Sequence, residues 1–149
     1  SDVCSSDLIF MEDKAKEYPN TFAYREFDKE LEFKAYAGSD IILMPSIKES
    51  CGIAQMSAMN YGAVPVVSNL KCFKDSIIQY GKTPESNKGI GFYSLNDSWS
   101  FLEVINNIIK LYQDNREEWL RIVTSCFLTD FSWINGALKK YLELYDSIL

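Results

Sequence analysis

The chain has 149 residues, 47% of them hydrophobic and 14% aromatic, a composition typical of one folded domain and not of a disordered segment. Its net charge of −6 argues against a nucleic-acid partner, because phosphate binding needs clustered Lys and Arg. No apolar run approaches the ~20 residues that a bilayer-spanning helix needs, so we expect no membrane span.

The side-chain inventory excludes several kinds of chemistry. The chain has no histidine, and no Cys-x-x-Cys pair occurs among Cys4, Cys51, Cys72 and Cys126. The usual His/Cys metal sites and the Ser-His-Asp or Cys-His catalytic centres therefore cannot be assembled from this chain alone. The sequence has neither disulfide spacing nor a signal peptide at its start, so we expect reduced thiols and a cytoplasmic protein.

The first part of the chain predicts an unstructured end followed by short elements. Residues 1–8 are polar and without periodicity, and we interpret them as a disordered or non-native end, with residues 9–149 forming one domain. The pattern of residues 9–18 predicts the end of a strand and a short helix, closed by Pro19. Residues 21–25 predict a short strand.

The next elements are a helix and a buried strand. Asp28 is the expected N-cap of a helix over residues 29–37 that ends at Gly38. Its inner side carries Leu31 and Ala35, with Phe33 as a further candidate. Residues 41–44, Ile-Ile-Leu-Met, are apolar on both faces, which suits a central parallel strand covered by helices on each side.

The middle of the chain predicts a strand, helix, strand unit. A loop over residues 46–51 leads into a helix from about Ile53 to Asn60, stopped by Gly62. Residues 64–67, Val-Pro-Val-Val, form the second buried strand. A short strand over residues 90–93 follows a polar loop.

The remainder predicts three helices. The first is amphipathic over residues 101–112 and has Asp97 or Ser98 as its cap. The second covers residues 115–126, and the third starts near Ser132. The chain is thus an α/β protein with a Rossmann-like, doubly wound parallel sheet and a helical C-terminal tail. In such sheets ligands bind beyond the carboxyl ends of the strands, here at loops 45–52 and 68–74.

One acidic loop stands out in the sequence. Glu49 lies on the loop that leaves the first buried strand, three residues before Gly52. The backbone N–H groups of Cys51, Gly52 and Ile53 would offer donors to an oxygen-rich ligand, and the carboxylate would accept hydrogen bonds from sugar hydroxyls or stabilise positive charge. Acidic residues also occur near helix starts because they complement the helix dipole, and the residues alone favour that simpler explanation.

An ordered series of motifs resembles the bacterial-type glycogen/starch synthase family. The segment Tyr36-Ala-Gly-Ser-Asp-Ile-Ile-Leu-Met-Pro-Ser46 is similar to the family's segment before its active-site glutamate, and Glu49-Ser-Cys-Gly-Ile is similar to its Glu-Pro-Cys-Gly-Leu motif. Gln55, Tyr61-Gly62, Lys74-Asp75 and Gly89-Ile-Gly-Phe92 are in register. Asp130-Phe-Ser-Trp133, Tyr141 and Leu144-Tyr145 match the closing segments.

The resemblance implies the C-terminal domain of the GT-B architecture, in which two Rossmann-like domains face a cleft. The parent would be a retaining hexosyltransferase that moves glucose from ADP-glucose or UDP-glucose to the non-reducing end of an α-1,4-glucan, with no cofactor. Glu49 would contact the donor glucose, supported by the amides of Cys51, Gly52 and Ile53. Phe27 lies where the family has a Tyr stacked on the nucleotide base, although an isolated Phe is more often a core residue. Cys51 is expected to be inert.

The sequence departs from the family in one loop. Leu70-Lys71-Cys72 stand where the family has Thr-Gly-Gly, so two side chains would crowd a phosphate that glycines let approach. Lys71 would supply charge to a diphosphate, or be an ordinary solvated lysine. Two alternatives to a synthase therefore stay open: a GT-B glycosyltransferase with another acceptor, and a non-catalytic domain that binds glucan or a synthase partner. The family's Lys-Thr-Gly-Gly motif and its Arg/Lys clamp are not in this sequence, so the chain alone is expected to be inactive.

Overall fold

The computed structural model describes residues 5–21, 28–81, 89–95 and 97–148, and it divides the chain into two compact units, residues 1–32 and 33–149. The boundary falls within the second helix, α2 (Lys29–Gly38). Most of the predicted strand over residues 21–25 lies outside the described residues.

The first unit contains α1 (Ser5–Glu17), where the sequence predicted the end of a strand and a shorter helix. The helix begins inside the segment that we set aside as a disordered end. Its residues are mostly helix formers, and i,i+3 ion pairs join Lys14 to Glu17 and Lys16 to Asp13. The helix ends two residues before Pro19, as expected from the restriction that a proline places on the residue before it.

Helix α2 begins as its sequence predicts. The carboxylate of Asp28 accepts hydrogen bonds from the backbone N–H groups of Glu30 and Leu31, which confirms Asp28 as the N-cap. None of the residues of α2 is buried, so the inner side predicted for this helix is wrong.

The second unit is built on a parallel sheet in the order β1-β2-β3, with strands β1 (Ile41–Met44), β2 (Val64–Ser68) and β3 (Phe92–Ser94). The predicted α/β class and the parallel pairing are confirmed. The described residues do not test the predicted central position of β1, because most of the predicted neighbouring strand over residues 21–25 lies outside them. In the described part of the chain β2 lies between the other two strands and is buried throughout, whereas Leu43 of β1 is 48% exposed. An apolar run identifies a strand but does not encode its place in the strand order.

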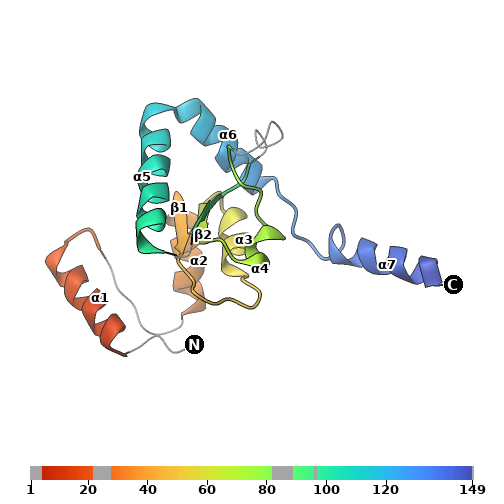
Figure 1. The fold of residues 1–149 in the computed structure, drawn as a ribbon, viewed down its shortest axis with the longest axis horizontal. Coiled ribbons are helices and arrows are strands. Elements are labelled where there is room, and N and C mark those ends of the chain that lie inside the picture. Colours follow the sequence, from red (N-terminus) through yellow and green to blue (C-terminus); the bar gives the residue numbers. More distant parts are fainter. Residues whose placement is uncertain (1–4, 22–27, 82–88, 96, 149) are drawn as a thin grey trace. The chain divides into compact units, whose positions relative to one another are not determined.

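Helices cover both sides of this sheet (Figure 1). Helix α3 (Ala54–Met59) packs on β1 and β2, and α5 (Ser98–Asp114) packs on β2 and β3 from the other side. The short α4 (Lys71–Lys74) follows β2, and α6 (Arg116–Phe127) contacts α3, α5 and β2. Together they bury the core, whose largest members are Trp119, Phe73, Met59, Ile108 and Ile122.

The helices after the sheet differ in how well the sequence located them. Asp97 caps α5, as predicted, and Asn115, which was predicted as the first residue of the next helix, is the cap of α6. The last helix, α7, is Ala137–Ile148 and begins five residues later than predicted, because Asp130 accepts hydrogen bonds from Ser132 and Asn135 and holds that stretch in turns. None of the helices within the described ranges has both the length and the apolar character that crossing a bilayer requires.

Candidate functional site

The loops that the sequence singled out meet at one edge of the sheet, because all three strands are parallel and end there. Two hollows open at this edge. One, of about 210 Å³, is lined by Pro45, Ser46, Ile47, Ser68, Leu95, Asp97, Ser98 and Phe101. The other, of about 270 Å³, is lined by Asn69, Lys74, Gln79, Tyr93, Ser94 and Leu95. The position of both hollows agrees with the strand-end rule for ligand binding.

Sequence reasoning missed the third loop at this edge. Residues 95–98 connect β3 to α5, and three of them line the 210 Å³ hollow. The sequence could have indicated this loop, because the rule that ligands bind beyond the carboxyl ends of the strands applies to the third predicted strand as well. Hydrogen bonds from Ser100, first from its side chain and then from its backbone N–H, lower the pKa of the Asp97 carboxyl. This carboxylate therefore adds negative charge to the rim.

Glu49 is half-buried on the loop after β1. Its Oε1 atom accepts hydrogen bonds from the backbone N–H groups of Ser50, at 3.0 Å, and Cys51, at 3.3 Å. Within the described residues its Oε2 atom has no hydrogen-bond donor. One oxygen of the carboxylate thus stabilises its own loop, a role that neither explanation of Glu49 predicted, and the other oxygen is available to a ligand.

The backbone amides after Glu49 are only partly as predicted. The Cys51 N–H donates to Glu49 and is not free, which corrects the expectation of three available donors. The N–H groups of Gly52 and Ile53 have no acceptor among the described residues. Ile53 is 65% exposed, whereas Gly52 is buried. Two donors therefore remain for an oxygen-rich ligand.

Gly52 is the point at which the first two candidate loops touch. It is buried with φ +70°, and a Cβ atom on it would lie 2.7 Å from Cε1 of Phe73 in α4. Only glycine fits this combination of a left-handed backbone and a close neighbour. The loop after β1 therefore rests directly on the helix after β2.

The three residues that replace Thr-Gly-Gly differ in their surroundings. Leu70 and Cys72 are half-buried and pack against the hydrophobic core. Lys71 is exposed, and no ion pair in the described part of the chain involves it. Of the three side chains, that of Lys71 is the one open to a ligand. Phe27, the candidate stacking residue, lies outside the described residues.

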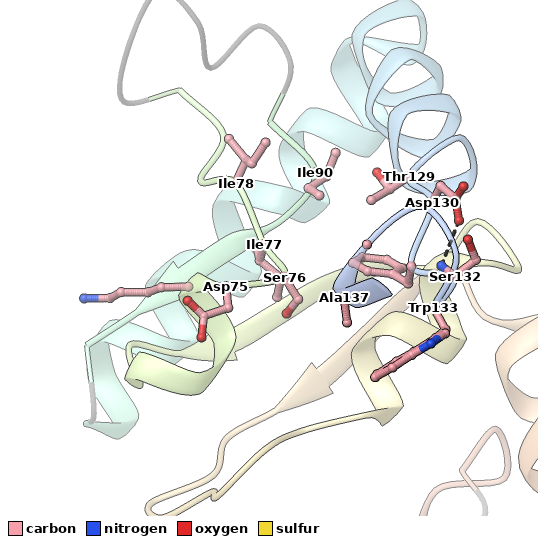
Figure 2. Close-up of a pocket in the computed structure, with 13 residues that line it drawn as sticks. Asp75, Ser76, Ile77, Ile78, Ile90, Thr129, Asp130, Ser132, Trp133 and Ala137 are labelled. Atoms are coloured by element: carbon pink, nitrogen blue, oxygen red, sulfur yellow. Dashed lines mark hydrogen bonds between the residues drawn. The ribbon is translucent and has the colours of Figure 1, made fainter. Parts of the chain in front are cut away.

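A larger hollow of about 490 Å³ lies between residues 74–78 and the segment after α6 (Figure 2). Figure 2 shows Asp75, Ser76 and Ile78 on one side of it and Asp130 and Trp133 on the other. Hydrogen bonds from Ser132 and then Asn135 lower the pKa of Asp130, whose carboxylate holds the turns that lead into α7. The Trp133 side chain is 61% exposed at the edge of this hollow.

Known proteins match this chain over most of its length. The glycogen synthase of Thermotoga petrophila is 40% identical over 125 residues, which are 83% of this chain and 25% of that protein. The glycogen synthase of Petrotoga mobilis is 39% identical over 135 residues (90% and 28%), and that of Streptococcus equi subsp. equi is 35% identical over 136 residues (91% and 28%). The chain thus spans little more than a quarter of the length of these relatives. No family model matches it.

A solved structure matches the fold as well as the sequence. The catalytic domain of starch synthase IV from Arabidopsis thaliana, determined with ADP and acarbose bound, superimposes with a TM-score of 0.81 and 28% sequence identity. The match covers 95% of this chain and 29% of that one. From the shared sequence, the parallel sheet and the acidic loop after β1, we conclude that this chain belongs to the glycogen and starch synthase family.

Proposed function

We propose that the protein to which this chain belongs transfers glucose from ADP-glucose or UDP-glucose to the non-reducing end of an α-1,4-glucan, with retention. The chain would form its C-terminal, donor-binding domain of GT-B type. The observation that carries the proposal is the loop after β1, on which one carboxylate oxygen of Glu49 and the N–H groups of Gly52 and Ile53 have no partner among the described residues. The start of this loop, residues 45–47, lines the 210 Å³ hollow at the strand ends. The relative determined with ADP and acarbose supports a nucleotide donor and a glucan-like acceptor.

These groups suit retaining transfer to a sugar. The unpaired Oε2 of Glu49 accepts hydrogen bonds from hydroxyls of the donor glucose, and its charge stabilises the positive charge that develops at the reacting carbon as the diphosphate leaves. The N–H groups of Gly52 and Ile53 donate to donor oxygens, and the exposed Lys71 adds positive charge where the family has two glycines. We place the protein in the cytoplasm, where free thiols such as Cys51, Cys72 and Cys126 stay reduced.

The proposal is tested with Glu49→Ala in the full-length protein. We expect kcat/KM for glucan elongation to fall by ~100-fold or more, because an electrostatic group at the reacting centre typically contributes this much. Elongation is measured with ADP-glucose and UDP-glucose, and Glu103→Ala, an exposed acidic position on α5, is the matched control. A loss of less than about tenfold for Glu49→Ala, or an equal loss for the control, contradicts the role of Glu49.

One observation favours a second candidate function. Lys71 and Cys72 stand where the family's two glycines approach the donor phosphates, and Cys72 packs on the core, which is compatible with a non-catalytic domain that binds glucan or a synthase partner. Calorimetry on the full-length protein separates the two. A synthase binds ADP-glucose or UDP-glucose, whereas a non-catalytic relative binds glucan or a partner protein alone. Nucleotide-sugar binding with transfer to another acceptor would identify a different glycosyltransferase.

A further inference from the structure

The most unusual polar residue in the core is Gln55, in the first turn of α3. Its side chain is fully buried, at 0% exposure. Its Nε2 donates to the carbonyl oxygen of Gly52, at 2.7 Å, and to the Ser76 hydroxyl, at 3.2 Å. Its Oε1 has no hydrogen-bond partner among the described residues. A buried amide with an unpaired oxygen destabilises the core relative to an apolar side chain of similar size, so its presence needs an explanation.

Gln55 belongs to a chain of hydrogen bonds that joins three segments of the site. The Ser76 hydroxyl donates to the carbonyl of Phe73, at 3.2 Å. The Tyr93 hydroxyl donates to the same carbonyl, at 3.1 Å, and to that of Ile77, at 2.6 Å. Gln55, Ser76 and Tyr93, which we call the Gln55 clamp, thereby connect the loop after β1 to the end of α4 and to β3.

The clamp determines where one of the free amides points. The Gly52 carbonyl and the Ile53 N–H belong to the same planar, trans peptide unit, so they point in opposite directions. Because the carbonyl points inward to Gln55, the Ile53 N–H points away from the core. The Phe73 ring and the Gln55 amide both border the space where a Gly52 side chain would lie. Gly52 is thus held by close packing as well as by the hydrogen bond from Gln55.

We propose that Gln55 is a positioning residue for the Glu49–Ile53 loop, which holds the Ile53 N–H and the Glu49 carboxylate toward an oxygen-rich ligand. The inference rests on the proposed function, in which that ligand is the nucleotide-sugar donor. Gln55 itself is sealed from solvent and touches no ligand. It acts through the Gly52 carbonyl, and this role accounts for a polar side chain in a place where an apolar one would pack.

The first test measures the loop itself by hydrogen exchange in the full-length protein. Gln55→Met keeps the length of the side chain and removes both donated hydrogen bonds. We expect amide exchange in residues 49–54 to accelerate by roughly tenfold, while exchange in α6 stays unchanged, because the loop loses its local anchor and the core does not. Unchanged exchange in residues 49–54 overturns the proposal.

The second test is a double-mutant cycle on the donor reaction. We expect Gln55→Met alone to lower kcat/KM by ~10- to 30-fold. In a Glu49→Ala background the same substitution should lower kcat/KM by less than about threefold, because the two residues act through one loop. Ile122→Val, a buried position in α6, controls for a general loss of stability and should lower kcat/KM equally in both backgrounds. Equal losses from Gln55→Met in the two backgrounds overturn the proposal.

The two tests separate this inference from the proposed function. If Glu49→Ala leaves elongation within tenfold of the unmodified protein, the proposed function fails, and hydrogen exchange still decides whether Gln55 holds the loop. If Gln55→Met does not fold, Ser76→Ala removes one acceptor of Gln55 and should change both readouts in the same direction by about two- to fivefold. No change in either readout for a folded Ser76→Ala counts against the clamp.

Discussion

Both the backbone conformation and the packing at position 52 require glycine. The backbone has φ +70°, and a Cβ atom would lie 2.7 Å from Phe73 and 3.0 Å from the Gln55 Oε1. We expect Gly52→Ala to lower the free energy of unfolding by ~2–4 kcal/mol, the sum of backbone strain and overpacking. Unfolding in urea measures this change.

Gly81→Ala is the matched control for Gly52→Ala. Gly81 has a similar φ of +80°, but nothing lies within 4 Å of the position that its Cβ would take. We therefore expect a loss of only ~1–2 kcal/mol, from backbone strain alone. Equal losses at the two glycines would show that the contact with Phe73 and Gln55 contributes nothing.

The candidate residues show what a motif does and does not specify. The motif correctly locates Glu49 and Gly52 at the end of a strand. It does not reveal that Glu49 uses one oxygen on its own loop, because that depends on loop dihedrals. Gln55 was in register with the family, but the sequence analysis assigned it no role. The sequence alone does not distinguish a buried glutamine from one on the surface. Its burial follows only from how α3, α4 and β3 pack.

Among the elements, α5 depends on Asp97 for its start. The Asp97 carboxylate accepts hydrogen bonds from the Ser100 hydroxyl and N–H, and these lower its pKa. A carboxyl whose pKa is lower in the folded than in the unfolded chain stabilises the fold above its unfolded value, ~3.9. That contribution is lost as the pH falls through the lower, folded-state pKa.

We therefore expect Asp97→Ala to be less stable than the unmodified chain at neutral pH, and the gap to narrow below about pH 4. Asp97→Asn keeps a capping oxygen but has no titratable group. Its free energy of unfolding should therefore be close to that of the unmodified chain at neutral pH, and the difference in stability between Asp97→Asn and Asp97→Ala should not shrink below about pH 4. Urea unfolding of the three proteins across this pH range gives the measurement. A gap between Asp97→Ala and the unmodified chain that does not change with pH would contradict the role of the charge.

The elements with strong local signals were the ones that the sequence predicted well. The helices α5 and α6 have both a capping residue and an apolar stripe, and their bounds were predicted within a few residues. The start of α7 was wrong because Asp130 and Ser132 favour turns as readily as a helix start. The order β1-β2-β3 was not predicted, because strand order depends on contacts between segments distant in sequence.

For the molecule as a whole, α7 contributes little to the stability of the 149-residue chain. None of its described residues is buried, and Tyr145 and Ile148 are 59% and 72% exposed. We expect removal of residues 137–149 to change the melting temperature by less than ~3 °C, because almost no apolar surface leaves the core. Trp119→Ala, at a buried position in α6, should cost ~3–5 kcal/mol and serves as the contrast. A large drop in melting temperature on truncation would show that α7 packs on the rest of the chain.

At the same scale, family membership and fold class were the parts most readily predicted from sequence. An ordered series of short motifs from Tyr36 to Tyr145 constrains the family far more than any single piece, and the alternation of strands and helices constrains the class. The division into two units was not predicted, because it depends on contacts and not on composition.

The common direction of the three strands has an evolutionary consequence. Residues that keep the protein folded are concentrated in the strands and helix faces, and most of the candidate site residues lie on or near the connections that follow the strands. Selection can rewrite these connections while the scaffold stays constant, which is how a Leu-Lys-Cys triplet can replace a glycine pair without loss of the fold. A library that varies only these connections should yield mostly folded proteins with altered donor preference.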